Sequence, residues 1–195
     1  MMRTATVVLG LMLLFTAGGC GDPAGSSTPA PGSSSQNSDA SKAAEHDASG
    51  GGELPRIDLA GIQELIQQTA AERRVLVIDF WATWCPPCVA NFPAIHQAVE
   101  AAGDKARYVS VTFDAPGTDE QKAVAFLKKN HAMSDAYLAL NEKQNDIVDG
   151  LGDKWTNVVV PAWFVFDAQG QLAGEYYDAN ELPAMLTQIR ELTAK

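Results

Sequence analysis

The fold of this chain is decided by residues 75–88, which read VLVIDFWATWCPPC in one-letter code. The stretch begins with an apolar run of strand length, which is typical of a strand covered on both faces. Cys85 and Cys88 follow with the two-residue spacing that places both thiols in the first turn of a helix. Because a helix N-terminus stabilises a thiolate, we predict Cys85 as the nucleophile and Cys88 as the thiol that resolves a mixed disulfide.

Two cysteines at this spacing also occur in zinc sites and in structural disulfides. A zinc site needs four ligands, and the only further cysteine of the chain is Cys20. The three histidines, His46, His96 and His131, show no paired metal spacing and are interpreted as linker, surface or packing residues. A purely structural disulfide that closes so short a loop contributes little chain-entropy stabilisation. The pattern therefore favours a redox-active dithiol and no metal site.

Residues 77–88 resemble the active-site signature of the thioredoxin superfamily. Two further positions agree: Pro93 resembles the kink proline of the family's active-site helix, and Pro161, after Val160, resembles its cis-proline. The resemblance covers residues 54–195. It implies an α/β domain with the thioredoxin fold, in which helices flank a central mixed β-sheet.

The resemblance also implies thiol-disulfide exchange with disulfide-containing or dithiol proteins. In that chemistry Cys85 attacks a partner disulfide and Cys88 displaces the product, with no cofactor and with a thiol electron donor such as a membrane protein. Trp84 is expected to offer an apolar landing surface for the substrate. The Val160–Pro161 pair is expected to face the sulfurs, where the missing N–H of proline leaves neighbouring backbone free to pair with an extended substrate.

Residues 118–157 resemble the extra strand and helix that membrane-anchored oxidoreductases of the TlpA/ResA kind carry before the cis-proline. Asn91 departs from that group, which commonly has an acidic residue there, and Asp79 stands where the group often has Asn. Asp79 instead resembles the aspartate of thioredoxin itself, which implies that it is the general base for Cys88. Burial in an apolar strand should raise its pKa. The lysine that often accompanies this aspartate is absent from residues 108–113.

Strand and helix patterns alternate through the predicted domain, with no internal repeat and no second domain. Strands are predicted at residues 75–82, 108–113, 136–140, 162–167 and 171–177. Helices are predicted at residues 119–130 and 142–151, and apolar stripes at helical spacing occupy residues 62–69, 88–102 and 182–189. Trp155 and Trp163 are expected in the core, without a role in the site.

The N-terminus resembles a secretory signal. An apolar segment at residues 7–15 is too short to span a bilayer, and small residues lead up to Cys20. Residues 17–20 (AGGC) resemble a lipoprotein cleavage box, with Ala where Leu is usual. We expect residues 1–19 to be removed and Cys20 to be lipidated. Ordinary signal-peptidase cleavage at the same point is the alternative, which leaves an unpaired thiol in an exported protein.

Residues 20–53 are expected to be a lipidated cysteine followed by a flexible tether. From residue 21 to residue 53, 23 of 33 residues are Gly, Ser, Pro or Ala. The segment therefore has too few large apolar residues to form a core. Such a coil spans on the order of 30 Å, enough to hold the domain off a membrane.

The formal net charge of −10 argues against a nucleic-acid partner. We expect the protein on the periplasmic side of a bacterial membrane, attached through its lipid.

These observations predict an extracytoplasmic thiol-disulfide oxidoreductase. We expect a reductant, because tethered relatives with a CPPC dithiol mostly reduce. One alternative is a thiol peroxidase of the same fold, although such enzymes usually place their resolving thiol elsewhere. The other is a copper-delivery or binding module, in which Cys85 and Cys88 would be soft ligands that lack a convincing third ligand.

Overall fold

The structure of the chain is a computed structural model, and it describes residues 54–152 and 154–194. The predicted signal at residues 1–19, the lipidation site Cys20 and the tether up to residue 53 lie outside the described residues. Within the described ranges, no helix combines the length and the apolar character needed to cross a membrane.

The apolar run of the signature forms β2 (Val75–Trp81), and all seven of its residues are buried. β2 pairs in parallel with β3 (Ala106–Thr112) and antiparallel with β5 (Ala162–Phe166). It is therefore an inner strand whose backbone is hydrogen-bonded on both edges and whose two faces are both covered. The prediction of a doubly covered strand is confirmed.

The sheet has six strands in the order β1-β4-β3-β2-β5-β6. The three remaining strands are β1 (Arg56–Ile57), β4 (Ala136–Ala139) and β6 (Leu172–Tyr176). The pairs β1–β4, β4–β3 and β3–β2 are parallel, whereas β2–β5 and β5–β6 are antiparallel, so the sheet is mixed as predicted. The sequence analysis missed β1, because a strand of two residues is too short to show alternation.

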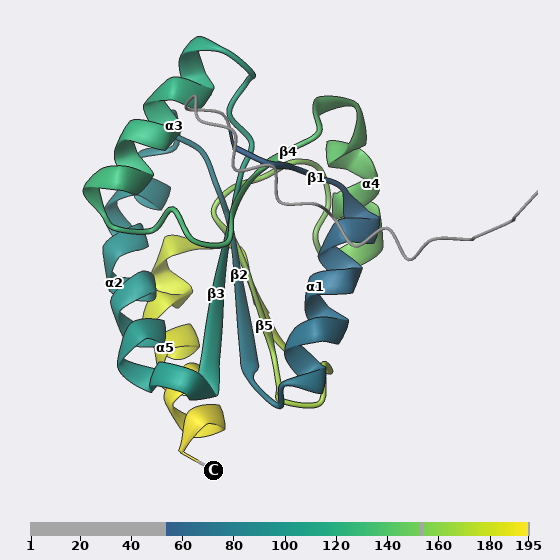
Figure 1. The fold of residues 1–195 in the computed structure, drawn as a ribbon, viewed down its shortest axis with the longest axis vertical. Coiled ribbons are helices and arrows are strands. Elements are labelled where there is room, and N and C mark those ends of the chain that lie inside the picture. Colours follow the sequence, from purple (N-terminus) through teal and green to yellow (C-terminus); the bar gives the residue numbers. More distant parts are fainter. Residues whose placement is uncertain (1–53, 153, 195) are drawn as a thin grey trace, which may run out of the picture. The chain divides into compact units, whose positions relative to one another are not determined.

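Helices cover both faces of the sheet (Figure 1). Their bounds are α1 (Leu59–Ala71), α2 (Pro86–Ala102), α3 (Thr118–Lys129), α4 (Gln144–Leu151) and α5 (Leu182–Thr193). Short 3-10 turns occur at Gly103–Lys105, Asn141–Lys143 and Ala179–Glu181. Each element predicted with two bounds begins and ends within two residues of its predicted position. The strand β4 and the helix α4 form the predicted insertion before the cis-proline.

Two apolar clusters lie on opposite faces of the sheet. One cluster holds α2, α3 and α5 through residues such as Phe92, Leu127 and Met185. The other holds α1 and α4 through residues such as Ile62 and Ile147. The arrangement is the thioredoxin fold, and it places the N-terminus of α2 at the end of the central strand.

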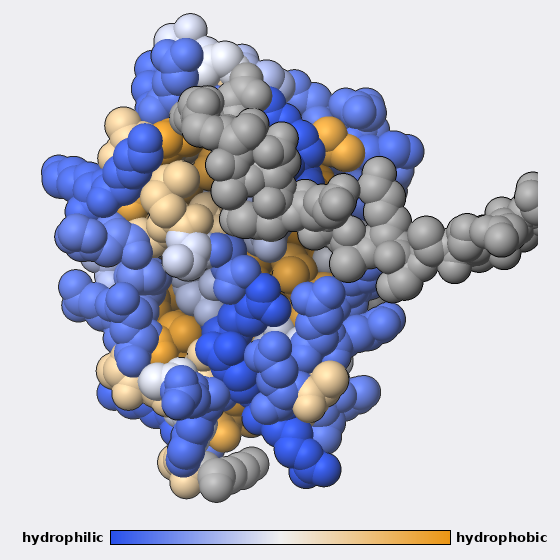
Figure 2. All heavy atoms as spheres, viewed as in Figure 1, coloured by the Kyte–Doolittle hydropathy of each residue, from blue (hydrophilic) through white to orange (hydrophobic). Residues whose placement is uncertain are grey.

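Hydrophilic residues cover most of the surface seen in Figure 2, and hydrophobic residues lie between them in separate patches. The large hydrophobic side chains that are exposed among the described residues are Trp84, Met133, Val159 and Leu172. Two of these belong to the predicted site: Trp84 precedes Cys85 within the signature, and Val159 precedes the Val160–Pro161 pair. The exposed apolar surface is thus partly concentrated where the sequence predicts substrate contact.

Candidate redox site

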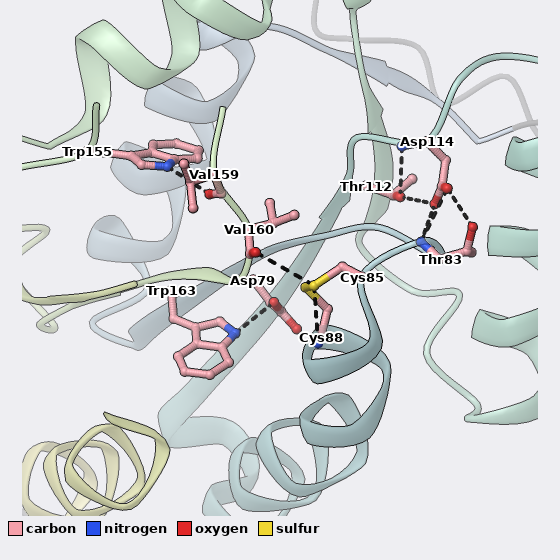
Figure 3. Close-up of a disulfide and its surroundings, with 10 residues drawn as sticks. All are labelled: Asp79, Thr83, Cys85, Cys88, Thr112, Asp114, Trp155, Val159, Val160 and Trp163. Atoms are coloured by element: carbon pink, nitrogen blue, oxygen red, sulfur yellow. Dashed lines mark hydrogen bonds between the residues drawn. A yellow bond between two sulfur atoms is a disulfide. The ribbon is translucent and has the colours of Figure 1, made fainter. Parts of the chain in front are cut away.

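Cys85 and Cys88 form a disulfide at the N-terminus of α2, with their Cα atoms 5.3 Å apart (Figure 3). Cys85 is the N-cap residue, and its Sγ accepts a hydrogen bond from the N–H of Cys88 at 3.3 Å. Pro86 and Pro87 occupy the first helical positions, where a missing N–H leaves no intrahelical hydrogen bond unmade. After reduction, the same N–H and the helix dipole favour a thiolate on Cys85.

Both cysteines are covered in this oxidised state. Cys85 is 5% exposed and Cys88 is 2% exposed, so both residues are buried in the disulfide form. The reason is that the bond holds Cys85 Sγ against the helix, while the carbonyl oxygen of Val160 lies 3.7 Å from this sulfur. The neighbouring Trp84 is 58% exposed, so a partner would meet Trp84 before it meets the sulfurs.

The Val160–Pro161 peptide bond is cis, as the resemblance implied. Pro161 is buried ahead of β5, and the carbonyl group of Val160 points at Cys85 Sγ (Figure 3). The indole N–H of Trp155 donates a hydrogen bond to the carbonyl oxygen of Val159 at 3.0 Å. Trp155 is buried in the core, as predicted. Its hydrogen bond also holds the loop that faces the disulfide. The sequence analysis assigned it no such role.

Asp79 lies on the face of β2 that packs under α2, because alternation puts it on the same side as Val77 and Trp81. It is 1% exposed. Tyr108 Oη donates a hydrogen bond to Asp79 Oδ2 at 2.6 Å, and Trp163 Nε1 donates one to Oδ1 at 2.9 Å. In Figure 3 the carboxylate lies between the Trp163 indole and the disulfide.

Burial raises the pKa of Asp79 from its ordinary 3.8 to about 7, against the smaller opposing effect of its two hydrogen bonds. Near neutral pH the carboxyl group is therefore present in both protonation states. Burial and the nearby Asp79 also raise the pKa of Tyr108 well above its ordinary value, so its hydroxyl remains a hydrogen-bond donor. Such a carboxyl group can accept a proton from a thiol and return it later.

The sequence analysis missed Tyr108 and Trp163 as partners of Asp79. Trp163 was placed in the core without a role, and Tyr108 was only the start of a predicted strand. The register of the strands explains why both side chains contact Asp79. Asp79 on β2 lies opposite Trp163 on β5, and Tyr108 on β3 is paired with Val77 on β2. Since Val77 and Asp79 point the same way, the Tyr108 side chain reaches the carboxylate diagonally.

A second buried carboxylate holds the chain just before the disulfide. Asp114 is fully buried and accepts hydrogen bonds from the backbone N–H of Thr83 at 2.9 Å and from its hydroxyl at 2.6 Å. The hydroxyl of Thr112 donates a further bond to Asp114 at 2.6 Å. This network fixes the turn that leads into Trp84 and Cys85, and nothing in the sequence pattern had singled it out.

No group of three or more His, Cys, Asp or Glu residues is placed to hold a metal ion within residues 54–152 and 154–194. His96 packs against the rings of Phe92 and Tyr108, and its Nδ1 lies 3.6 Å from Glu100 Oε2. His131 is exposed beyond the end of α3. Within the described residues, neither of these two histidines forms a hydrogen bond, ion pair or ring contact with the disulfide cysteines.

The fold and the disulfide at the helix N-terminus define the class: thiol-disulfide oxidoreductases of the thioredoxin superfamily. The chain belongs to the Redoxin family, which it matches over residues 38–189, more than half of its length.

Comparisons with individual proteins agree with this class. The chain is 32% identical over 68 residues to the thioredoxin-like protein YneN of Bacillus subtilis strain 168, covering 35% of this chain and 39% of that protein. It is 34% identical over 85 residues to a thioredoxin of Malassezia sympodialis, covering 43% of this chain and 76% of that protein. Thus the match spans most of the thioredoxin but well under half of YneN.

Solved structures share the fold. A thiol:disulfide interchange protein from Chlorobium tepidum TLS superposes with a TM-score of 0.53 at 17% identity, covering 75% of this chain and 99% of that chain. A thiol:disulfide interchange protein from Bacteroides sp. gives a TM-score of 0.52 at 15% identity, covering 75% and 91%. At these identities the likeness concerns the fold alone.

The raised pKa of Asp79 predicts a specific pH dependence of stability. The unfolded chain loses this proton near pH 3.8, whereas the folded protein keeps it up to about pH 7. Stability should therefore fall as pH rises through this window, by roughly 4 kcal/mol at 1.36 kcal/mol per tenfold change in ionisation. Asp79→Asn cannot ionise, so it should gain this amount relative to the wild type between pH 4 and pH 8.

Urea unfolding of both oxidised proteins across that range measures the effect. The comparison at pH 3, where the wild-type carboxyl group is largely neutral in both the folded and the unfolded protein, gives the cost of the amide itself and serves as the control. A stability difference that stays constant from pH 4 to pH 8 would contradict the assignment.

Asp114→Asn should destabilise the turn before the disulfide. One oxygen of the carboxylate becomes an NH₂ group that faces a donor, so we expect a loss of about 2 kcal/mol in the free energy of unfolding. Thr112→Val is a comparison at the same network: it removes the hydroxyl that donates to the Asp114 carboxylate and accepts from the Asp114 backbone N–H, and it should cost about 1–3 kcal/mol. Equal stability of Asp114→Asn and the wild type in urea unfolding would show that the network does not hold the turn.

Proposed function

We propose that this protein is an extracytoplasmic thiol-disulfide oxidoreductase that exchanges disulfides with partner proteins, chiefly as a reductant. The single observation that supports the activity most strongly is the Cys85–Cys88 disulfide at the N-terminus of α2, with Asp79 buried on the same face of the sheet. A nucleophile, a resolving thiol and a proton acceptor are thus present in one place.

The reaction runs in two displacements. The Cys85 thiolate attacks one sulfur of a partner disulfide, forming a mixed disulfide and releasing the other partner sulfur as a thiolate. Cys88 then attacks Cys85 Sγ, which forms the Cys85–Cys88 bond and releases the second partner thiolate. Two electrons pass from the dithiol to the partner, and a separate thiol donor must return them.

Asp79 supplies the base for the second displacement. Cys88 is 2% exposed, so water is a poor acceptor for its proton. A carboxyl group whose pKa is raised to about 7 by burial is partly ionised at neutral pH and can take that proton. Its protonated form stays neutral and is therefore compatible with the apolar surroundings.

The substrate is proposed to bind between Trp84 and the Val160–Pro161 pair. Trp84 and Val159 are exposed apolar side chains, and they adjoin Cys85 and Val160 in the chain. The backbone carbonyl of Val160, 3.7 Å from Cys85 Sγ, marks where an extended partner segment would lie when its sulfur reaches Cys85. A partner with an accessible disulfide in an extended segment fits this arrangement.

The direction and the location rest on the sequence. The CPPC dithiol and the tether-like segment resemble those of membrane-anchored oxidoreductases of the TlpA/ResA kind, which supports the reductant role, and a membrane thiol protein is the proposed electron donor. The signal-like N-terminus and the box before Cys20 support export and a lipid anchor. The adjacent resolving thiol, Cys88, favours disulfide exchange over a thiol peroxidase.

Cys88→Ser should trap mixed disulfides with oxidised protein substrates such as insulin, because Cys85 can still attack while nothing resolves the product. Non-reducing gels followed by mass spectrometry would detect the adduct on Cys85. A reductant forms this adduct with oxidised insulin and forms none with fully reduced insulin. Cys85→Ser is the control and should trap little and lose insulin reduction. Equal trapping by the two variants contradicts the assigned roles.

Cys20→Ser should release the mature protein into the soluble extracytoplasmic fraction, since it removes the acyl attachment point. Thiol exchange by the purified variant should equal that of the wild type, which separates anchoring from chemistry. Cell fractionation and intact-mass measurement of Cys20 acylation test this. Retention of Cys20→Ser in the membrane fraction, or wild-type protein without acyl mass, would reject the anchor.

A further inference from the structure

The segment just before β5 carries the Val160–Pro161 pair, and one buried side chain holds it in place. Trp155 is 4% exposed, and its indole N–H donates to the carbonyl oxygen of Val159 at 3.0 Å. The backbone N–H of Val159 donates to the carbonyl oxygen of Asn157 at 2.9 Å. Both backbone groups of Val159 are therefore used within this segment.

The Trp155 indole is packed against the sheet. Its ring centroid lies 4.7 Å from that of Phe80 on β2 and 5.3 Å from that of Phe164 on β5. A third ring, that of Phe113 just after β3, lies 6.0 Å away. Phe80 and Phe164 are fully buried on inner strands, so the sheet fixes the position of the indole. A movement of the Val159 carbonyl would therefore break its hydrogen bond, because the donor cannot follow.

The hydrogen bond from Trp155 fixes the orientation of the peptide unit that joins Val159 to Val160. Among the described residues only the Val160–Pro161 bond is cis, so the Val159–Val160 unit is trans. In a planar trans peptide the C=O and the N–H point in opposite directions. Because the Val159 carbonyl points at Trp155, the Val160 N–H points away from Trp155. Cys85 lies on the other side of this segment from Trp155 (Figure 3), and the two residues belong to apolar clusters on opposite faces of the sheet.

The N–H of Val160 is an open backbone donor beside the disulfide. It has no hydrogen-bond partner within the described residues, and the carbonyl oxygen of the same residue lies 3.7 Å from Cys85 Sγ. The next residue, Pro161, has no N–H of its own. An extended polypeptide that brings a disulfide to Cys85 carries backbone carbonyl groups, which are suitable acceptors for the Val160 N–H.

We propose that Trp155 is a positioning residue that aims the Val160 N–H at the backbone of a polypeptide partner. A carbonyl oxygen of the partner accepts from this N–H while the partner disulfide lies at Cys85. Trp155 acts through the Val159 carbonyl, and the benefit is a peptide unit already oriented before the partner binds. A small disulfide without peptide groups has no carbonyl to place there, so Trp155 favours polypeptide substrates over small ones. This inference rests on the disulfide exchange proposed above.

Trp155→Phe keeps an aromatic ring against the sheet and removes the N–H donor. Prereduced protein is mixed with excess disulfide, and the loss of protein thiols is followed by acid quench and thiol labelling. The two oxidants are insulin, which presents peptide groups, and bis(2-hydroxyethyl) disulfide, which has none. The second-order rate constant with insulin should fall about fivefold, roughly the effect of one hydrogen bond. The rate constant with the small disulfide should stay within about twofold of the wild-type value.

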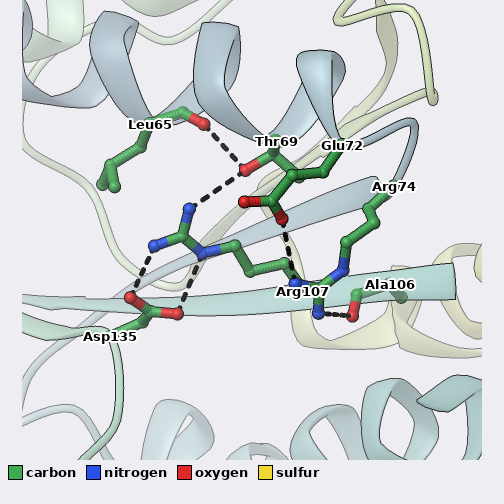
Figure 4. A network of polar contacts seen from close by, with 7 residues as sticks. All are labelled: Leu65, Thr69, Glu72, Arg74, Ala106, Arg107 and Asp135. Atoms are coloured by element: carbon green, nitrogen blue, oxygen red, sulfur yellow. Dashed lines mark hydrogen bonds and ion pairs between the residues drawn. The ribbon is translucent and has the colours of Figure 1, made fainter. Parts of the chain in front are cut away.

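Thr69→Val is the matched control for a general loss of stability. The buried hydroxyl of Thr69 donates to the carbonyl oxygen of Leu65 at 2.7 Å and accepts from Arg107 at 3.3 Å (Figure 4). Arg107 also forms an ion pair with Asp135 at 2.6 Å, beside an open cavity of about 370 Å³. Arg107 is paired with Leu76 at the start of β2, whereas the disulfide follows the end of that strand. Thr69→Val should lower the free energy of unfolding in urea and leave both rate constants within about twofold.

Two outcomes of the rate comparison overturn the role of Trp155. One is a Trp155→Phe variant that reacts with insulin as fast as the wild type. The other is an equal loss of rate with both disulfides, which would indicate a general change at the dithiol. The wild type separates this inference from the proposed function: if it reduces neither disulfide, the exchange activity itself fails, and the role of Trp155 fails with it.

A second measurement keeps Trp155 intact and observes the Val160 N–H directly. In Cys88→Ser, Cys85 is joined in a mixed disulfide either to a peptide with one cysteine or to 2-mercaptoethanol. Amide hydrogen exchange at Val160, measured by NMR, should be about tenfold or more slower in the peptide adduct, while the Trp155 indole N–H stays protected in both. Equal Val160 exchange in the two adducts, or release of the Trp155 indole N–H on peptide attachment, would reject the positioning role.

Discussion

The burial of one carboxyl group in the central strand is the constraint on which the site depends. Asp79 lies in a strand that is covered on both faces, and its two oxygens accept hydrogen bonds from β3 and β5. A charged carboxylate is costly in such a place, so its pKa rises to about 7. The same burial that destabilises the ionised protein near neutral pH also suits the group to its proposed role as a proton acceptor. In that proposal, stability and chemistry are linked through a single residue.

Around this group the fold brings three separate parts of the chain to one place. The N-terminus of α2 supplies the sulfurs, and the loop before β5 supplies the Val160 carbonyl and the cis-proline. The loop after β3 supplies Asp114, which accepts hydrogen bonds from Thr83. Each loop is tied by a buried polar contact rather than by apolar packing alone. Hydrogen bonds to buried groups are directional, so they orient the two loops toward the disulfide more narrowly than hydrophobic contact would.

The surface divides into regions with different chemistry. Apolar side chains, Trp84 and Val159, are exposed beside the disulfide, while an ion-paired polar cavity lies toward the other end of α2. The acidic formal charge of the chain favours solubility.

The sequence by itself determined the fold class, the redox pair and the buried aspartate, because each depends on local pattern: an apolar run, a two-residue cysteine spacing and one carboxylate inside that run. It also placed the cis-proline through resemblance. It could not reveal β1, which is too short for a periodic signal, nor the coverage of Cys85 in the disulfide. The partners of Asp79 were decided only by tertiary structure. Tyr108 and Trp163 are 29 and 84 residues away from it, and only strand order and register bring them within hydrogen-bonding distance.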